Sequence, residues 1–135
     1  MKDTKRNSMP RQHIDFDTVR KLALQLPEVE DASAYGSPAL RVRGQLLACI
    51  AINKSAEPGS LAVRVDFDRR AELLEAAPEI YYITDHYLNY PSVLVRLSRI
   101  REDALLDLLK MSWQFVAAQH GKTRRTTRKR SPRRG

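Results

Sequence analysis

The charge of this chain is concentrated at one end. Its last fourteen residues, Lys122–Gly135, carry eight of the 24 basic residues and no acidic residue, so they hold the whole net charge of +8. The first 121 residues contain the other sixteen basic residues and all sixteen acidic ones, and are neutral overall. A segment this charged and this poor in apolar residues cannot bury a core. Folding is therefore confined to the neutral part of the chain.

Length and composition predict one domain with an extension at each end. The 135 residues, 42% of them hydrophobic, suffice for a single core. We expect a disordered polar extension over 1–12, a domain over 13–121 and a disordered basic tail over 122–135. No signal peptide is expected, and the longest apolar run, Leu46–Ile52, is far shorter than the roughly 20 residues of a membrane span. Cys49 is the only cysteine, which favours a reducing, cytoplasmic location.

Apolar side chains spaced at the helical period predict three helices, over Ile14–Leu26, Asp68–Ala77 and from about Arg101 to Ala118. Their expected end signals are Asp15 as the cap of the first, Asp66 or Asp68 as the cap of the second, and Gly121 as the stop of the third.

Alternating apolar and polar residues predict the strands of a sheet. The alternation covers Ala39–Arg43, Leu61–Val65 and Val93–Leu97, with Leu46–Ile52 as a continuous apolar central strand and Ile80–Ile83 as a weaker candidate. A tight turn at Gly44-Gln45 is expected between the first two strands. Short connections indicate an α+β fold: an antiparallel sheet with an N-terminal helix, a short middle helix and a long C-terminal helix packed on one face.

Three segments and the closing helix resemble the MmcQ/YjbR family. The segments are Tyr35–Gly44 (YGSPALRVRG), Tyr81–Tyr87 (YYITDHY) and Tyr90–Leu97 (YPSVLVRL), and the helix carries Leu108-Leu109 followed by Ser112-Trp113. The resemblance covers about Phe16 to Ala118. It implies a compact α+β unit similar to the frataxin-like (CyaY-like) arrangement, and a DNA-binding role through a "double wing", with no established enzymatic activity.

The frataxin-like comparison also raises iron binding, which in those proteins uses an acidic ridge on the first helix. Here the first helix offers only Asp15 and Asp17 beside Arg20 and Lys21. We therefore do not expect iron binding.

The basic tail is the first candidate site. Clustered cations bind polyanions by releasing counterions, and eight phosphate contacts would give log K a slope of about −7 against log salt. Ser131–Arg134 (SPRR) resembles elements of histone tails that lie in AT-rich minor grooves. We expect contacts to nucleic acid, mainly to phosphates and with little sequence preference; the alternative is a solubilising tail or a targeting signal. The residues are Lys122, Arg124, Arg125, Arg128, Lys129, Arg130, Arg133 and Arg134.

Four arginines are the second candidate site. Strand alternation turns them away from the apolar face, and on neighbouring strands they would form one anion-binding surface. The alternative is an ordinary solvated face on which Asp66 pairs with Arg64. The residues are Arg41, Arg43, Arg64 and Arg96.

A tyrosine-rich segment is the third candidate. Pro78–Pro91 contains no Lys or Arg, which argues against a nucleic-acid surface and leaves a pocket for a small ligand or peptide. The alternative is that the tyrosines pack the sheet edge and that His86 is hydrogen-bonded in a turn. The candidate pocket residues are Tyr81, Asp85, His86, Tyr87 and Tyr90.

Catalytic and metal signals are missing from the sequence. His13, His86 and His120 show no metal-ligand spacing with one another or with Cys49, whose apolar strand marks it as a core residue. There is no Gly-rich phosphate loop and no nucleophile elbow. The sequence predicts no enzyme, no metal and no cofactor. Two functions stay open. One is nucleic-acid binding through the tail, with an arginine-bearing sheet face as a second contact, and the other is a small-ligand or protein-interaction module with an incidental tail.

Overall fold

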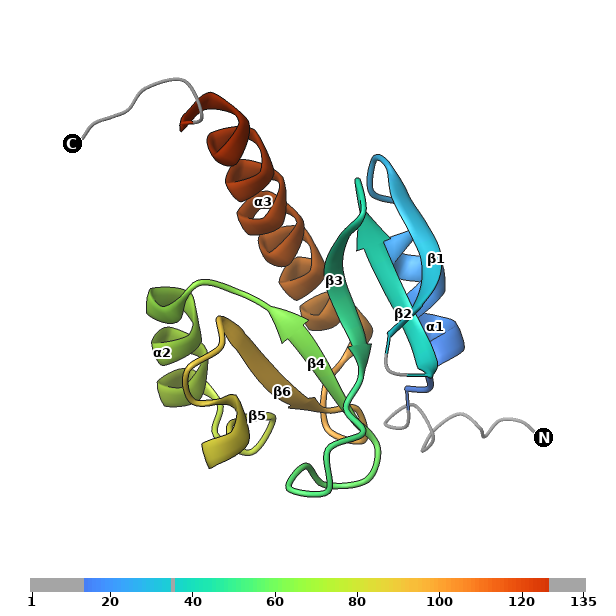
Figure 1. The fold of residues 1–135 in the computed structure, drawn as a ribbon. Helices are drawn as coiled ribbons and strands as arrows, with labels where there is room; N and C mark the ends of the chain where they lie inside the picture. Colours follow the sequence, from blue (N-terminus) through green and yellow to red (C-terminus); the bar gives the residue numbers. More distant parts are fainter. Residues whose placement is uncertain (1–13, 35, 127–135) are drawn as a thin grey trace.

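The computed structural model describes residues 14–34 and 36–126, with side chains described as far as Ala118. Ten elements follow one another along the chain (Figure 1): α1 (Phe16–Ala23), β1 (Val29–Ala34), β2 (Ser37–Val42), β3 (Gln45–Ile50), β4 (Ser60–Arg64), α2 (Phe67–Ala76), β5 (Tyr81–Tyr82), the 3₁₀ helix η2 (Asp85–Tyr87), β6 (Ser92–Arg96) and α3 (Glu102–Thr126).

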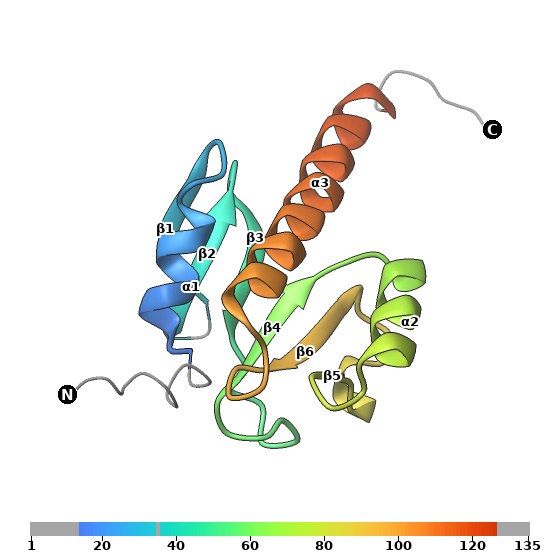
Figure 2. The ribbon, with the colours of Figure 1, turned by 180° about the vertical axis from the view of Figure 1, so that it is seen from behind.

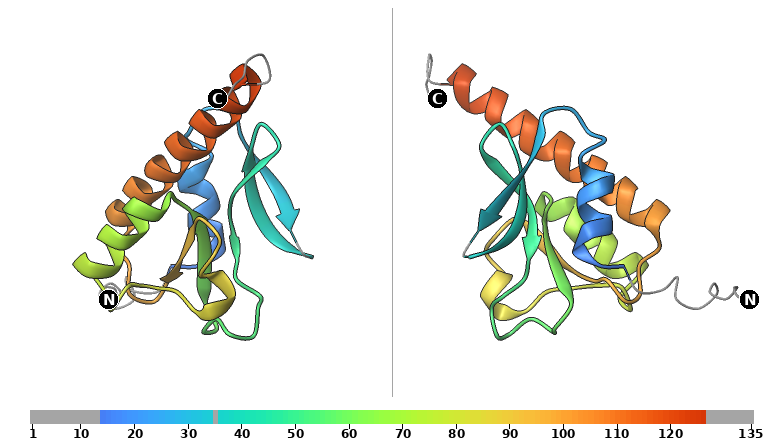
Figure 3. Two further views of the ribbon diagram at one scale, coloured as in Figure 1. Left: turned by 60° about the vertical axis from the view of Figure 1, so that its left-hand side comes forward. Right: turned by 90° about the vertical axis from the view of Figure 1, so that its right-hand side faces the viewer.

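The strands form one antiparallel sheet in the order β1-β2-β3-β4-β6-β5. Helices α1 and α3 cover one face, which we call the inner face, and α2 lies at the β5–β6 end (Figures 2 and 3). The opposite face is the outer face. The predicted α+β class is confirmed.

The helices begin where short acidic side chains satisfy free backbone N–H groups. Asp15 accepts a hydrogen bond from the Thr18 amide at 3.0 Å, and Asp66 accepts one from the Arg69 amide at 2.7 Å. Both predicted caps are confirmed, with Asp66 rather than Asp68 in the second.

The core lies between the inner face and the two covering helices. Alternate residues of β4 and β6, among them Leu61, Val63, Val93 and Val95, are fully buried there. They pack with the buried stripe of α3, made of Leu105, Leu108, Leu109 and Val116. The same strands direct their other residues to the outer face.

One strand, β1, was not predicted. It carries Glu30 and Asp31, and its burial is limited to Val29 and Ala34. As an edge strand it pairs only with β2, so most of its side chains face solvent and show no regular apolar alternation.

The turn after β2 is shifted by one residue from the predicted Gly44-Gln45. Val42 pairs with Gln45, which leaves Arg43 and Gly44 as the two turn residues. Both have positive φ, 51° and 81°, as a type I′ hairpin turn requires. Arg43 is therefore a turn residue and does not lie on the sheet.

Helix α3 continues to Thr126, so the predicted stop at Gly121 is wrong. Helix-forming residues flank this glycine on both sides. They outweigh its cost in a helix, which is only about 1 kcal/mol relative to alanine. Lys122, Arg124 and Arg125 thus belong to a helix that projects beyond the sheet (Figure 1). The predictions for 1–12 and for the tail beyond Thr126 lie outside the described residues. None of the described helices is both long enough and apolar enough to cross a membrane.

Candidate functional site

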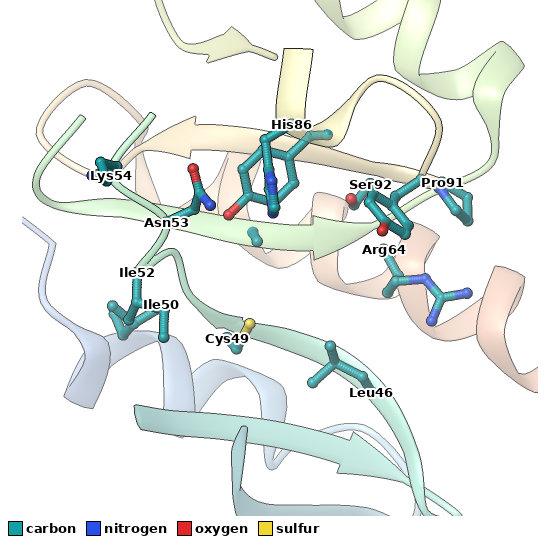
Figure 4. A pocket seen from close by; sticks show the side chains of 13 residues that line it. Leu46, Cys49, Ile50, Ile52, Asn53, Lys54, Arg64, His86, Pro91 and Ser92 are labelled. Atoms are coloured by element: carbon teal, nitrogen blue, oxygen red, sulfur yellow. The ribbon is translucent and has the colours of Figure 1, made fainter. Parts of the chain in front are cut away.

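A pocket of about 830 Å³ opens on the outer face of the sheet (Figure 4). Its floor comes from β3 and β4, one wall from the segment Asp85–Ser92, which we call the rim segment, and one end from the loop after β3. The lining residues are Leu46, Cys49, Ile50, Ile52, Asn53, Lys54, Ala62, Arg64, His86, Tyr87, Tyr90, Pro91 and Ser92.

The floor is apolar because the outward positions of two central strands carry small or aliphatic side chains. Cys49 of β3 lies directly opposite Ala62 of β4 in the ladder. These two short side chains leave depth that larger residues would fill. Burial raises the pKa of the Cys49 thiol above its usual range, with a smaller opposing effect from Arg41, so Cys49 is a neutral part of the floor.

A register shift between β2 and β3 lies near one end of the pocket. Leu40 pairs with Ala48 and Arg41 with Leu46, so Leu47 forms a bulge in β3. A bulge bends its strand, and β3 pairs with β4 only through Ala48–Ile50. Arg64, one residue past the last of these pairs, lies where the two strands have parted.

Arg64 is the unusual charge of the site. Its Nε atom is buried and has no hydrogen-bond partner among the described residues. Its guanidinium carbon lies 5.8 Å from the ring centre of Phe115 on α3. Burial lowers the pKa of Arg64, yet an arginine stays protonated at neutral pH. Lys54 lies at the opposite end of the pocket, as Figure 4 shows.

Aromatic rings form the wall. His86 meets Tyr87 edge to face, with ring centres 4.9 Å apart, and lies 6.2 Å from Tyr90. Two of the lining residues, Tyr90 and Ile52, are 57% and 52% exposed. Large apolar side chains left open around a concave surface are typical of binding sites.

Arg70 of α2 holds the rim segment in place. This side chain is only 8% exposed, and its guanidinium donates to the backbone carbonyl oxygens of four rim residues. Its Nη1 bonds the oxygens of Tyr87 (3.2 Å), Tyr90 (2.8 Å) and Ser92 (3.2 Å), and its Nη2 bonds that of Leu88 (3.0 Å). The guanidinium also stacks 4.8 Å from the Phe67 ring. The wall is thus preformed by one buried cation.

Comparison with known proteins shows the family to which the chain belongs. The family model YjbR matches residues 24–115, which is more than half of the chain and includes the floor, the rim segment and most of α3. The chain belongs to the YjbR family. A protein of Deinococcus radiodurans with a DUF419 domain, DR2400, has a similar crystal structure, with a TM-score of 0.63 and 22% identity over 80% of this chain and 82% of that one. No significant match is found among curated proteins.

The predicted arginine face does not form as a unit in this YjbR domain. Arg41 donates to the carbonyl oxygens of Gly44 and Ser33, and Arg43 pairs with Glu28. Arg96 is held by Glu57 at 2.9 and 2.8 Å, by two carbonyl oxygens, and by stacking 4.3 Å from the Tyr82 ring. Asp66 caps α2, and no ion pair joins it to Arg64 among the described residues. Of the four, Arg64 alone lines the pocket.

Of the five residues predicted to line a tyrosine pocket, three line the outer-face pocket. His86, Tyr87 and Tyr90 line it, whereas Tyr81 and Asp85 do not. Tyr81 is 7% exposed and belongs to the inner core, because alternation along β5 turns it to the opposite face from Tyr82. Asp85 begins η2 and is exposed.

Arg70 and the floor residues were missed from the sequence. A signal for Arg70 was present, since it shares the helical stripe of Leu73, Leu74 and Ala77, which pack on the core. A charge on such a stripe indicates a buried partner. Within residues 14–34 and 36–118, no group of His, Cys, Asp and Glu side chains is arranged to hold a metal ion.

Proposed function

We propose that this YjbR protein binds nucleic acid, with the basic tail making most of the contacts and phosphates as their main target. The observation that carries the proposal is the confinement of the whole net charge of +8 to Lys122–Gly135. Such a segment binds phosphate backbones with little regard to sequence. A binding role, without catalysis, in a reducing cytoplasm agrees with the buried neutral thiol of Cys49.

The fold supports the proposal through the position of α3. Its last turns carry Lys122, Arg124 and Arg125 beyond the sheet, so the tail starts away from the body (Figure 1). The sheet does not add a second cationic surface, because Arg41, Arg43 and Arg96 are engaged within the domain. The DNA-binding role implied by the family resemblance points the same way.

A salt series on the full chain tests the proposal. Binding to a mixed-sequence DNA duplex is measured for the wild type and for a variant in which all eight basic tail residues are Gln. We expect a slope of log K against log salt of about −7 for the wild type. The magnitude of this slope should decrease by about 0.9 for each cation removed. Equal affinity and equal slope for the two proteins would refute the role of the tail.

A matched pair of triple variants locates the contacts. Replacing Lys122, Arg124 and Arg125 with Gln removes three charges from the end of α3, and replacing Arg69, Arg99 and Arg101 with Gln removes three exposed charges from the body. The first triple variant should reduce the magnitude of the slope by about 2.7, and the second should leave the slope unchanged. The reverse result would move the interface to the body.

A further inference from the structure

The outer-face pocket is a second binding feature, separate from the basic tail. Its volume of about 830 Å³ lies within the range of small-molecule sites, roughly 300–1,000 Å³. Its wall does not need a ligand to form, because Arg70 already fixes the rim segment through four carbonyl oxygens. A preformed concavity loses little conformational freedom when a ligand binds.

The lining is apolar in the middle and cationic at the ends. Cys49, Ala62 and Leu46 line the floor, and Tyr87 and Tyr90 line the wall. Arg64 and Lys54 mark the two ends (Figure 4). A ligand that satisfies this lining has an apolar body and at least one anionic group.

Arg64 sets the position of the anionic group. Its Nε is closed off from solvent, but its Nη atoms form no hydrogen bond with the described residues, so their N–H groups remain for the oxygens of a bound species. The carboxylate nearest in sequence, Asp66, is committed to the cap of α2. The guanidinium fork matches carboxylate and phosphate oxygens in geometry and charge.

We propose that this pocket binds a small organic anion, with its ring or aliphatic body between the Cys49–Ala62 floor and the Tyr87–Tyr90 wall and its carboxylate or phosphate on Arg64. A nucleic-acid strand fits the lining less well, since its charged backbone would lie against an apolar floor. The site is independent of the tail, so it extends the function beyond nucleic-acid binding.

The test uses three probes that share a naphthalene body: 2-naphthoate, 2-naphthyl phosphate and the neutral 2-naphthamide. Each is titrated into the full chain at physiological salt and followed by the backbone amide NMR signals of Cys49, Ala62 and Tyr90. We expect these signals to move, and 2-naphthoate to bind about tenfold more tightly than 2-naphthamide. Whichever of the two anions binds more tightly identifies the ligand as a carboxylate or a phosphate ester.

Substitutions assign the preference to one residue. Arg64→Gln should reduce the naphthoate-to-naphthamide ratio to about one, and Arg64→Lys should retain part of it, because lysine keeps the charge without the fork. Arg69→Gln, at an exposed arginine of α2 that pairs with Glu72, is the matched control and should keep the tenfold ratio. Ala62→Leu, which fills the floor, should weaken all three probes together.

Several results would overturn the proposal. One is an unchanged ratio in both Arg64 variants, and another is movement of signals only outside the pocket. Failure of all three probes to bind up to their solubility limits would also exclude the site. Displacement of 2-naphthoate from the pocket by a DNA duplex would assign the pocket to nucleic acid. The tail variant with eight Gln residues should bind 2-naphthoate as the wild type does, so the two proposals can fail separately.

Discussion

Arg70 and Arg64 are the same side chain in two different settings. Both are withdrawn from solvent, burial lowers the pKa of both, and neither pairs with a carboxylate among the described residues. Arg70 is saturated by four carbonyl oxygens of the rim segment. Arg64 has a ring beside it and a buried Nε without an acceptor. Arg70 therefore holds the pocket wall in place, whereas Arg64 lines the pocket with its hydrogen-bonding capacity unused by the described residues.

The comparison shows that burial of an arginine does not define its role; the acceptors around it do. Satisfied donors stabilise the segment that supplies the acceptors, whereas an unsatisfied donor lowers stability until a ligand supplies the missing oxygens. Arg70 should therefore matter most to folding, and Arg64 most to binding.

The largest effect is expected at Arg70. Arg70→Met removes the four side-chain hydrogen bonds to the rim segment and should lower the free energy of unfolding by about 3 kcal/mol. Urea unfolding measures the loss. Arg69→Met, at the neighbouring exposed position, is the control and should stay within about 0.5 kcal/mol of the wild type. Similar values for both would mean that the four carbonyl bonds stabilise little.

The effect at Arg64 should be smaller and opposite in sign. Arg64→Met removes a buried unsatisfied donor, a gain of about 1–3 kcal/mol, and loses a cation–π contact of about 0.5–1 kcal/mol. We expect the free energy of unfolding to rise by about 1 kcal/mol in the absence of ligand. A fall of that size would show that Arg64 serves to fill the gap between β3 and β4.

The smallest effect is expected at the surface ion pair between Arg96 and Glu57. The Arg96 guanidinium lowers the pKa of Glu57, so this pair stabilises the fold above the ordinary Glu pKa, and its contribution is lost as the pH falls through the lowered value. The stability difference between wild type and Glu57→Gln should thus be present at pH 7 and vanish in acid. A difference that persists at pH 2 would show that the charge on Glu57 is not its source.

The sheet and its helices could be predicted because each depends on local pattern. Alternation in Leu61–Val65 and Val93–Leu97 and the cap at Asp15 are properties of single segments, and the structure confirms them. The edge strand β1 was not predicted, because a strand that is paired on one side only needs few buried residues and shows little apolar alternation.

The site could be predicted only in part, because it depends on which strands are neighbours. Alternation turned Arg41, Arg64 and Arg96 outward, but their partners Gly44, Phe115 and Glu57 come from other turns, helices and loops. The floor pair of Cys49 and Ala62 likewise follows from the β3–β4 register.

The most direct measurement follows the guanidinium Nη–H signals of Arg64 and Arg70 during the 2-naphthoate titration. The Arg64 signal should shift and become protected from exchange as the carboxylate supplies an acceptor, and should stay in place with 2-naphthamide. The Arg70 signal should not move with either probe, because its acceptors are already present. An Arg64 signal that ignores 2-naphthoate while the probe occupies the pocket would contradict the account.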